Sequence, residues 1–127
     1  MSYVISRSRT RWATRRGRRG GHVPTFDATT LRVAIDFVAR EVSDICAGQQ
    51  SDVTAVHDVG GGGVATALAE VAAVTGLGAR IDELEGHGEL FAEFPGRFLV
   101  ATKDPADFHL RAAATGVGSM SWPPLSL

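Results

Sequence analysis

Four consecutive glycines, Gly60 to Gly63, stand between a β-branched segment that ends in His57-Asp58 and an alanine-rich segment that begins at Val64. This order predicts a strand, a glycine loop and a helix. Glycine adopts positive φ and has no Cβ, so the loop can bring backbone N–H groups close to a ligand. Because a helix N-terminus favours negative charge, we expect an anion such as phosphate there. The residues predicted to hold it are Gly60, Gly61, Gly62, Gly63 and Val64.

The alternative is that the glycine run is only a flexible turn. It matches neither GxxxxGK[ST] nor GxGxxG, and no lysine follows it. His57 and Asp58 stand at the C-terminal end of the predicted strand, where open α/β sheets place ligands. These two residues either take part in binding or cap the turn.

Glu93 and Arg97 are a second candidate pair, four residues apart across a proline–glycine turn. They either belong to the same binding site or form a surface ion pair that contributes about 0–1 kcal/mol. We assign no catalytic residue and no metal ligand, because the remaining acids lack ordered ligand spacing and are expected in a solvated loop. Those acids are Asp82, Glu83, Glu85 and Glu89, together with Glu93.

The other reactive side chains predict little chemistry. His22, His87 and His109 have no partner at ligand spacing and are expected to be exposed. The single cysteine, Cys46, excludes an internal disulfide. It is expected to be a buried structural thiol on the apolar side of a helix.

Composition indicates one globular domain. The chain has 127 residues, 44% hydrophobic and 21% charged, which is ordinary for a globular protein. No apolar run approaches the ~20 residues that cross a membrane, and no signal peptide is visible, so we expect a cytoplasmic protein with no membrane partner. The net charge is −1, but the charge is unevenly distributed. Seven arginines stand before Val23, and an excess of acidic residues in the rest of the chain offsets their positive charge.

The elements that must position these residues can be predicted from periodicity. Asp27 can cap a helix whose apolar residues recur in steps of four and three, and Gly48 can end it. Its predicted apolar face is Leu31, Ile35, Val38, Val42 and Ile45. The further predicted elements are a strand at 53–59, a helix at 64–75 closed by Gly76, strands at 79–84 and 97–102, and a helix from Asp104-Pro105 to Gly116.

These elements predict an α+β fold, an α/β sandwich with a mixed sheet of about four strands packed by helices. Residues 1–22 are expected to be a basic linker or a disordered head, residues 23–117 the domain, and residues 118–127 an irregular tail. The tandem Pro123-Pro124 argues against a strand in that tail. The arginine-rich head could instead bind nucleic acid or phosphate, although no recognised nucleic-acid module follows it.

The segment from His57 to Ala65 resembles the C-terminal domain of phosphoribosylformylglycinamidine synthase, which carries a similar HDVSDGGLAVALAE stretch. Three other places agree with that family: Arg18-Arg19-Gly20-Gly21 with Pro24 and Asp27, then Gly76-Leu77-Gly78-Ala79, and Leu90-Phe91-Ala92-Glu93 with Pro95-Gly96-Arg97-Phe98, which is similar to LFAESPGRF. The matches keep their order and spacing. The resemblance implies the fold of the C-terminal domain of aminoimidazole ribonucleotide synthetase.

The sequence also departs from the family pattern. The Ser-Asp of the loop is Gly60-Gly61 here, and the serine of LFAES is Phe94. The resemblance implies an ATP-dependent C–N ligase of the glutamine amidotransferase type, acting on formylglycinamide ribonucleotide with ATP and Mg²⁺. Because the chain begins in the family's linker, we expect the ATP-binding domain to be absent, the chain to bind no cofactor alone, and the chain to be inactive alone.

Three hypotheses follow. In the first, the chain is a fragment of the synthase that works beside an ATP-binding N-terminal portion or other synthase subunits, with self-association through an unpaired sheet edge. In the second, it is a small phosphate- or nucleic-acid-binding protein that uses the arginine-rich head. In the third, it is a non-functional remnant.

Overall fold

The computed structural model describes residues 2–6, 27–81, 90–122 and 124–125. The helices in these ranges are α1 (Ala28–Cys46), α2 (Gly63–Thr75) and α4 (Pro105–Ala114). The longer strands are β1 (Ser2–Ser6), β2 (Val53–Asp58), β4 (Phe98–Thr102) and β5 (Ser119–Trp122). Two short strands, β3 (Gly78–Ala79) and β6 (Pro124–Leu125), pair with each other.

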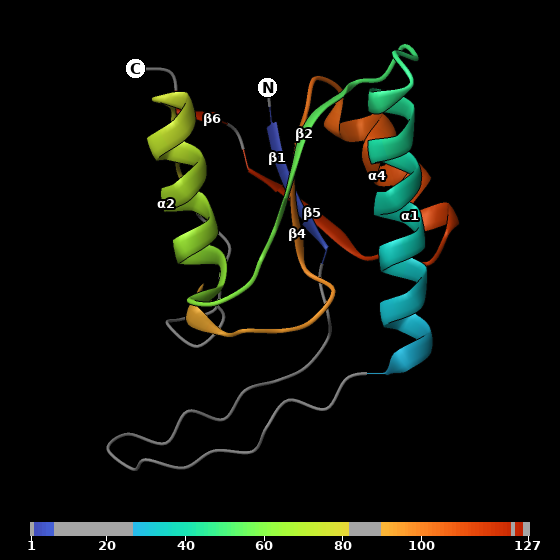
Figure 1. Cartoon of the computed structure of the whole chain (residues 1–127), viewed down its shortest axis with the longest axis horizontal. Helices are drawn as coiled ribbons and strands as arrows, with labels where there is room; N and C mark the ends of the chain where they lie inside the picture. Colours follow the sequence, from blue (N-terminus) through green and yellow to red (C-terminus); the bar gives the residue numbers. More distant parts are fainter. Residues whose placement is uncertain (1, 7–26, 82–89, 123, 126–127) are drawn as a thin grey trace.

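The longer strands form one sheet in the order β2-β4-β1-β5. Figure 1 shows this sheet between two helical layers, with α1 and α4 on one side and α2 on the other. Every pair of neighbouring strands in it is antiparallel. The predicted α+β class with about four strands is therefore confirmed, while the described strands pair antiparallel throughout and not in the expected mixture. Of the helices in the described ranges, none has the length and apolar character needed to cross a lipid bilayer.

Three strands lie where the sequence predicted none, and they are β1, β5 and β6. Strand β1 comes from the head that was expected to be a linker or disordered, and it pairs with β4 on one side and β5 on the other, with Val4 opposite both Val100 and Ser121. Its Tyr-Val-Ile run suits a pleated strand, and in pairing it satisfies the backbone groups of β4. The rest of the head, residues 7–22, lies outside the described residues.

The segment after α4 was expected to be irregular, but it forms β5 and β6. Pro124 has no N–H to donate, which is tolerated in a two-residue strand at a sheet edge. The strand expected at 79–84 is reduced to β3, and its last residues lie outside the described part. One sheet contains β1, β2, β4 and β5, so it includes strands from all three predicted segments. The segment boundaries at residues 22 and 117 stay a prediction.

The predicted helix ends are confirmed. The Asp27 carboxylate accepts a hydrogen bond from the Thr30 N–H at 2.9 Å, which caps α1. Asp104 does the same for α4, accepting from the Asp107 N–H at 3.0 Å. Gly76 follows α2 with φ of +70°, the left-handed conformation that ends a helix.

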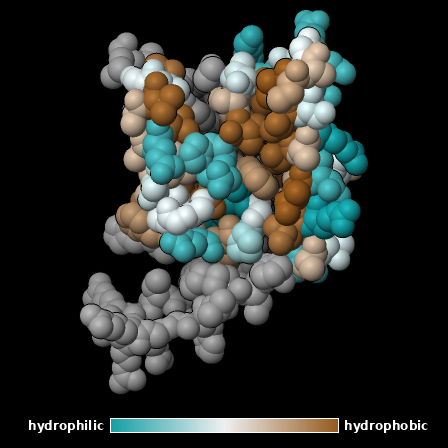
Figure 2. Space-filling view, viewed as in Figure 1, coloured by the Kyte–Doolittle hydropathy of each residue, from teal (hydrophilic) through white to brown (hydrophobic). Residues whose placement is uncertain are grey.

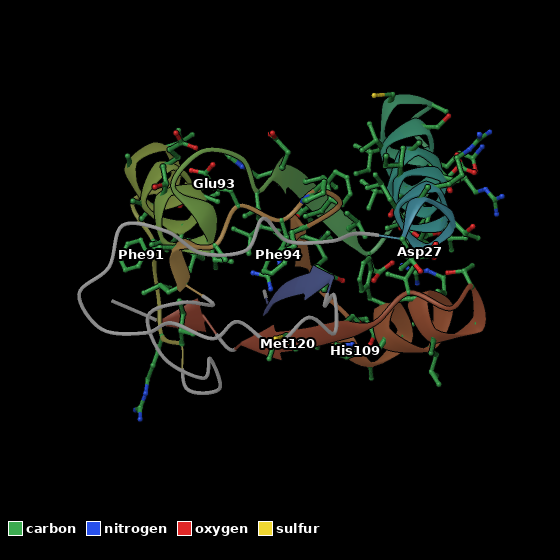
Figure 3. The ribbon with its side chains drawn as sticks, turned by 90° about the horizontal axis from the view of Figure 1, so that it is seen from below. Asp27, Phe91, Glu93, Phe94, His109 and Met120 are labelled. Carbon is green, nitrogen blue, oxygen red and sulfur yellow. The ribbon has the colours of Figure 1, made fainter. Side chains whose placement is uncertain are left out.

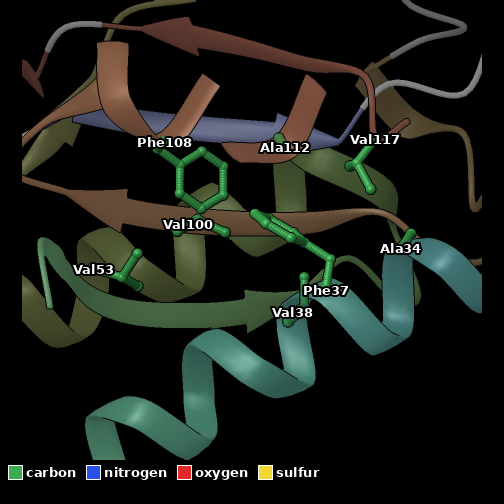
Figure 4. Close-up of a cluster of buried hydrophobic side chains, with 8 residues drawn as sticks. All are labelled: Ala34, Phe37, Val38, Val53, Val100, Phe108, Ala112 and Val117. Atoms are coloured by element: carbon green, nitrogen blue, oxygen red, sulfur yellow. The ribbon is translucent and has the colours of Figure 1, made fainter. Parts of the chain in front are cut away.

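Alternation along β4 divides the core into two layers. Val100 joins a cluster under α1 and α4, and Figure 4 shows that cluster around Phe37 and Phe108, whose rings meet edge to face with centroids 5.5 Å apart. Leu99 points the other way into a cluster under α2. Because successive side chains of a strand point to opposite faces, one short strand anchors helices on both sides of the sheet.

The buried face of α1 is rotated from the predicted one. Its buried residues are Ala34, Phe37, Val38 and Glu41. Ile35 and Val42, both predicted to be in the core, are 44% and 39% exposed. Cys46 is exposed as well, so the expectation of a buried thiol was wrong. The periodicity located an apolar stripe correctly, but the sheet covers only one side of it.

Candidate functional site

The glycine run forms a tight turn between β2 and α2. Gly62 is the N-cap of α2 with φ of +85°, and Gly63 begins the helix with φ of +68°. The Gly63 N–H donates to the Gly60 carbonyl oxygen at 3.1 Å, which closes the turn. The strand, turn and helix predicted from the sequence are therefore present at this place.

The four glycines are not equivalent. A Cβ on Gly62 would overlap the Thr66 hydroxyl, and one on Gly63 would lie 2.7 Å from the Phe91 backbone carbon. A Cβ on Gly61 would meet nothing within 4 Å, and one on Gly60 would lie 3.7 Å from Asp58 Oδ2. Only Gly62 and Gly63 are thus required by both φ and space.

A carboxylate already sits at this turn. The Gly62 N–H donates to Glu93 Oε1 at 2.8 Å. Figure 3 shows Glu93 beside α2, while Phe94 lies toward the sheet. A negative charge at a helix N-terminus is stabilising by about 0.3–1 kcal/mol, because it faces unpaired N–H groups and the positive end of the helix dipole. The turn therefore binds an anionic group in this structure, and that group is part of the chain.

Arg97 has a different environment from the expected surface ion pair with Glu93. It is 5% exposed, and its guanidinium carbon lies 4.4 Å from the centroid of the Phe94 ring. Phe94 is itself buried, so the residue that replaces the serine of the LFAES motif fills the core under the guanidinium. The Arg97 carbonyl oxygen accepts from the Val59 N–H at 3.0 Å, which fixes β4 beside the start of the glycine turn.

His57 links β2 to α2. Its Nδ1 lies 2.6 Å from the Asp58 carbonyl oxygen, and its Nε2 lies 3.1 Å from Glu70 Oε2. Both partners are oxygen atoms that accept hydrogen bonds, so the ring nitrogens act as donors where these bonds form. Asp58 is mostly exposed, with Oδ1 4.0 Å from Nδ1. His57 therefore holds the end of the strand to the helix that follows the turn.

Two residues of this site were not predicted from the sequence. Glu70 is the partner of His57, and Thr66 occupies the space above Gly62. Both are polar residues of α2, whereas only the apolar positions of that helix entered its prediction. The signal that could have found Thr66 is its place four residues after Gly62, one helical turn away.

The geometry suits an anion more than a metal ion. Backbone N–H groups of the turn are hydrogen-bond donors, which phosphate and carboxylate accept. Among the described residues, no group of three or more His, Cys, Asp or Glu side chains could hold a metal ion. A Mg²⁺ ion prefers several oxygen ligands, so the described residues alone do not fit one.

A second polar cluster lies away from the glycine turn. Arg111 of α4 contacts Glu41 of α1 with two nitrogens at 3.2 Å, Asp52 at 2.8 Å, and Asp107 one helical turn earlier. Asp52 also accepts a hydrogen bond from the Thr102 hydroxyl at 2.7 Å. This cluster ties α1, β2, β4 and α4 together, and we regard it as structural because every charge in it faces a partner.

The cluster shifts two pKa values. Burial acts to raise the pKa of Asp52, but hydrogen bonds from Thr102 and Arg111 outweigh it, so the pKa lies below 3.8. Burial acts to lower the pKa of Arg111, and the hydrogen bonds and charges of Glu41 and Asp52 raise it above its ordinary value instead. Both groups are therefore held in their charged forms by one another.

His109 was expected to be exposed and without a partner. It is half-buried, and its Nδ1 lies 2.5 Å from the Ser119 hydroxyl oxygen. The expectation was wrong because the strand β5 that carries Ser119 was not foreseen. His22, His87, the acids at 82–89 and the arginines at 7–19 lie outside the described residues.

Comparison with known families and proteins agrees with this architecture. Residues 19–122 match the family described as AIR synthase related protein, C-terminal domain. The subunit PurL of phosphoribosylformylglycinamidine synthase from Agrobacterium fabrum is 34% identical over 105 residues, and that from Rhodospirillum rubrum is 37% identical over 105 residues. Each alignment covers 80% of this chain and 13% of the relative.

A further relative matches a shorter stretch of the chain. The PurL subunit from Methanothermobacter thermautotrophicus is 40% identical over 75 residues, which is 54% of this chain and 10% of that protein. The chain thus spans about a tenth to an eighth of the length of these relatives.

Proposed function

The chain belongs to the family of AIR synthase related proteins, C-terminal domain, and from this premise we propose that it serves as the C-terminal domain of a phosphoribosylformylglycinamidine synthase. In that role it supplies a phosphate-binding glycine turn to a larger active site. The reaction would be the ATP-dependent conversion of formylglycinamide ribonucleotide to the amidine in purine biosynthesis, in the cytoplasm.

One observation carries the proposal. Gly62 and Gly63 hold a backbone conformation that side chains rarely adopt, and the Gly62 N–H points at a carboxylate oxygen. A phosphate oxygen has the same hydrogen-bonding chemistry as that carboxylate oxygen. The turn is therefore already shaped and polarised for an anion, and a substrate or nucleotide phosphate would take the position of the Glu93 carboxylate.

The proposed binding residues divide by role. Gly60, Gly61, Gly62, Gly63 and Val64 would surround the phosphate with backbone groups. Glu93 would leave the turn when phosphate enters. His57 would hold the end of β2 through its contact to Glu70, and the Asp58 carbonyl oxygen would orient the His57 ring. Arg97, buried over Phe94, would support the turn from beneath through its backbone bond to Val59.

ATP and Mg²⁺ would be held mainly by other synthase sequence. A metal ion has no cluster of ligands among the described residues. When bound, the ion would neutralise phosphate charge during phosphoryl transfer. We accordingly propose that the chain acts only together with an ATP-binding portion or other subunits of the synthase.

The experiment is a complementation assay. A relative's synthase from which the matching C-terminal domain has been deleted is mixed with the purified chain, ATP, formylglycinamide ribonucleotide and glutamine or ammonia. We expect no amidine from either component alone and some from the mixture, less with Gly62→Val, and an unchanged amount with the matched control Gly61→Ala. Turnover by the chain alone would contradict the proposal.

A further inference from the structure

The His57 ring lies between two oxygen atoms that belong to opposite sides of the glycine turn. Its Nδ1 lies 2.6 Å from the Asp58 carbonyl oxygen, at the end of β2. Its Nε2 lies 3.1 Å from Glu70 Oε2, on the helix that follows the turn. The ring therefore bridges the strand that enters the turn and the helix that leaves it.

These two contacts fit only the doubly protonated ring. A backbone carbonyl oxygen and an ionised carboxylate accept hydrogen bonds and cannot donate them. A neutral imidazole has one N–H group, so its other nitrogen would direct a lone pair at one of the two oxygens. The imidazolium has two N–H groups and donates to both oxygens at once. The bridge between β2 and α2 is therefore complete only in the charged form of His57.

The surroundings of the ring are polar and open to solvent. His57 pairs with Leu99, which packs under α2, so the His57 side chain lies on the α2 face of the sheet. The charged groups in contact with it among the described residues are Glu70 from α2 and Asp58 from its own strand, whose Oδ1 lies 4.0 Å from Nδ1. The His57 side chain is 33% exposed, so solvent can deliver and remove its proton.

The two sides of β2 also differ in polarity at the surface. Figure 2 shows hydrophilic residues between α2 and β2 on the face in view, and hydrophobic residues along the side of α1 that borders β2. A change of charge on the α2 side therefore takes place beside water and not inside the apolar core.

We propose that His57 is a positioning residue of the glycine turn and that it acts only while both of its ring nitrogens carry protons. This statement rests on the proposed function, in which the turn binds phosphate. The doubly protonated ring holds β2 to α2, and the backbone N–H groups of Gly62 and Val64 between them keep their direction. When the ring loses one proton, one of its two contacts sets a lone pair against an oxygen atom, and that contact opens.

The predicted consequence is a dependence of anion binding on pH. Histidine in general changes charge at about pH 6.5, within the range in which side-chain carboxylates stay ionised. Sulfate is the probe, because it keeps its charge in this range, whereas phosphate changes its own. We expect sulfate to bind roughly threefold more tightly at about pH 6 than at about pH 8, measured by the Gly62 amide shift.

Substitutions identify the group that is responsible. His57→Gln is the matched control, since it keeps a side-chain N–H donor but has no charge to gain, and its sulfate binding should not change with pH. Glu70→Gln should also remove the dependence, because its amide can donate to the lone pair of a neutral ring. Glu93→Gln should keep the dependence, because it alters the competing carboxylate and not the ring. A pH dependence that persists in His57→Gln would overturn the proposal.

The ring protons give a readout that does not require an anion. At about pH 6 without sulfate, imidazole NMR should show slowly exchanging protons on both ring nitrogens, and Glu70→Ala should remove the Nε2 proton signal alone. A ring that shows neither signal would overturn the proposal. Equal sulfate binding at both pH values would defeat the role of His57 alone, whereas absence of sulfate binding at every pH would defeat the proposed function and this proposal with it.

Discussion

Glu93 and Gly62, 31 residues apart in sequence, are joined by a 2.8 Å hydrogen bond from the glycine N–H to the carboxylate. The bond places a negative charge at the N-terminus of α2, the position that we propose for a phosphate. In the proposed function, an incoming phosphate would have to displace this carboxylate. The competition between the Glu93 carboxylate and the phosphate would then set the affinity of the turn for phosphate.

The glycine turn should tolerate substitution at one end only. Gly62→Ala should destabilise the fold by about 1–3 kcal/mol, because the residue has positive φ and its Cβ would overlap Thr66. Gly61→Ala, the matched control, should be neutral or stabilise by a few tenths of a kcal/mol, because its Cβ would enter open space. Thermal unfolding measures both. Equal Tm values for the two variants would show that the turn is a plain loop.

The family's serine and aspartate should be restorable. Neither Gly60 nor Gly61 has positive φ, and a Cβ at either position makes no close contact. The double variant Gly60→Ser, Gly61→Asp should unfold at the same or a higher temperature. Each glycine removed lowers the conformational entropy of the unfolded chain, which stabilises the folded state by about 0.4–1 kcal/mol. A clear loss of stability in calorimetry would mean that these two glycines are also structurally required.

The His57–Glu70 contact should strengthen phosphate binding at the turn without being required for it. His57→Ala removes the 3.1 Å link between β2 and α2, but it leaves the backbone donors in place. Phosphate binding should weaken a few-fold, about 1 kcal/mol or less. Isothermal titration compares this variant with Gly62→Val. If His57→Ala abolished binding while Gly62→Val retained it, the imidazole would be the ligand and the backbone would not.

The Arg111 cluster should make stability fall in acid. The folded pKa of Asp52 lies below its unfolded value of 3.8. Its contribution is therefore present above about pH 4 and is lost as pH falls through the folded pKa. Urea unfolding at a series of pH values measures the slope. Asp52→Asn should flatten that slope, and an unchanged slope in this variant would assign the acid sensitivity to other carboxylates.

Removal of the guanidinium is the complementary change. Arg111→Met should cost about 2 kcal/mol, because Glu41, Asp52 and Asp107 would lose their shared partner. Arg32→Met serves as the control, since Arg32 forms only an exposed pair with Asp36 within one helix. We expect the control to change stability by less than about 0.5 kcal/mol, as measured by urea unfolding.

Local sequence signals predicted the elements around the site well. Asp27 and Asp104 cap helices because their side chains reach backbone N–H groups two or three residues away, a relation that one segment contains entirely. The glycine run and Gly76 likewise impose a local conformation. Strand, turn and helix at the site could therefore be read directly from spacing.

The remaining features depend on partners that are distant in sequence. Nothing near Glu93 indicates that its carboxylate faces Gly62, and nothing near Tyr3 indicates that it pairs beside Ala101 in the sheet. The exposure of Cys46 and the rotation of α1 also depend on where the sheet ends. Periodicity finds an apolar stripe, but the width of the covering sheet decides which part is buried.

The most direct test of the phosphate-binding turn is a phosphate titration followed by amide NMR, in the unaltered chain and in Glu93→Gln. We predict shifts confined to residues 57–66, with millimolar affinity, and tighter binding by roughly threefold to tenfold in Glu93→Gln, because that variant removes the competing charge. Gly62→Val should show no shift. Absence of a shift in residues 57–66 at roughly 50 mM phosphate, in both the unaltered chain and Glu93→Gln, would show that the turn does not bind phosphate.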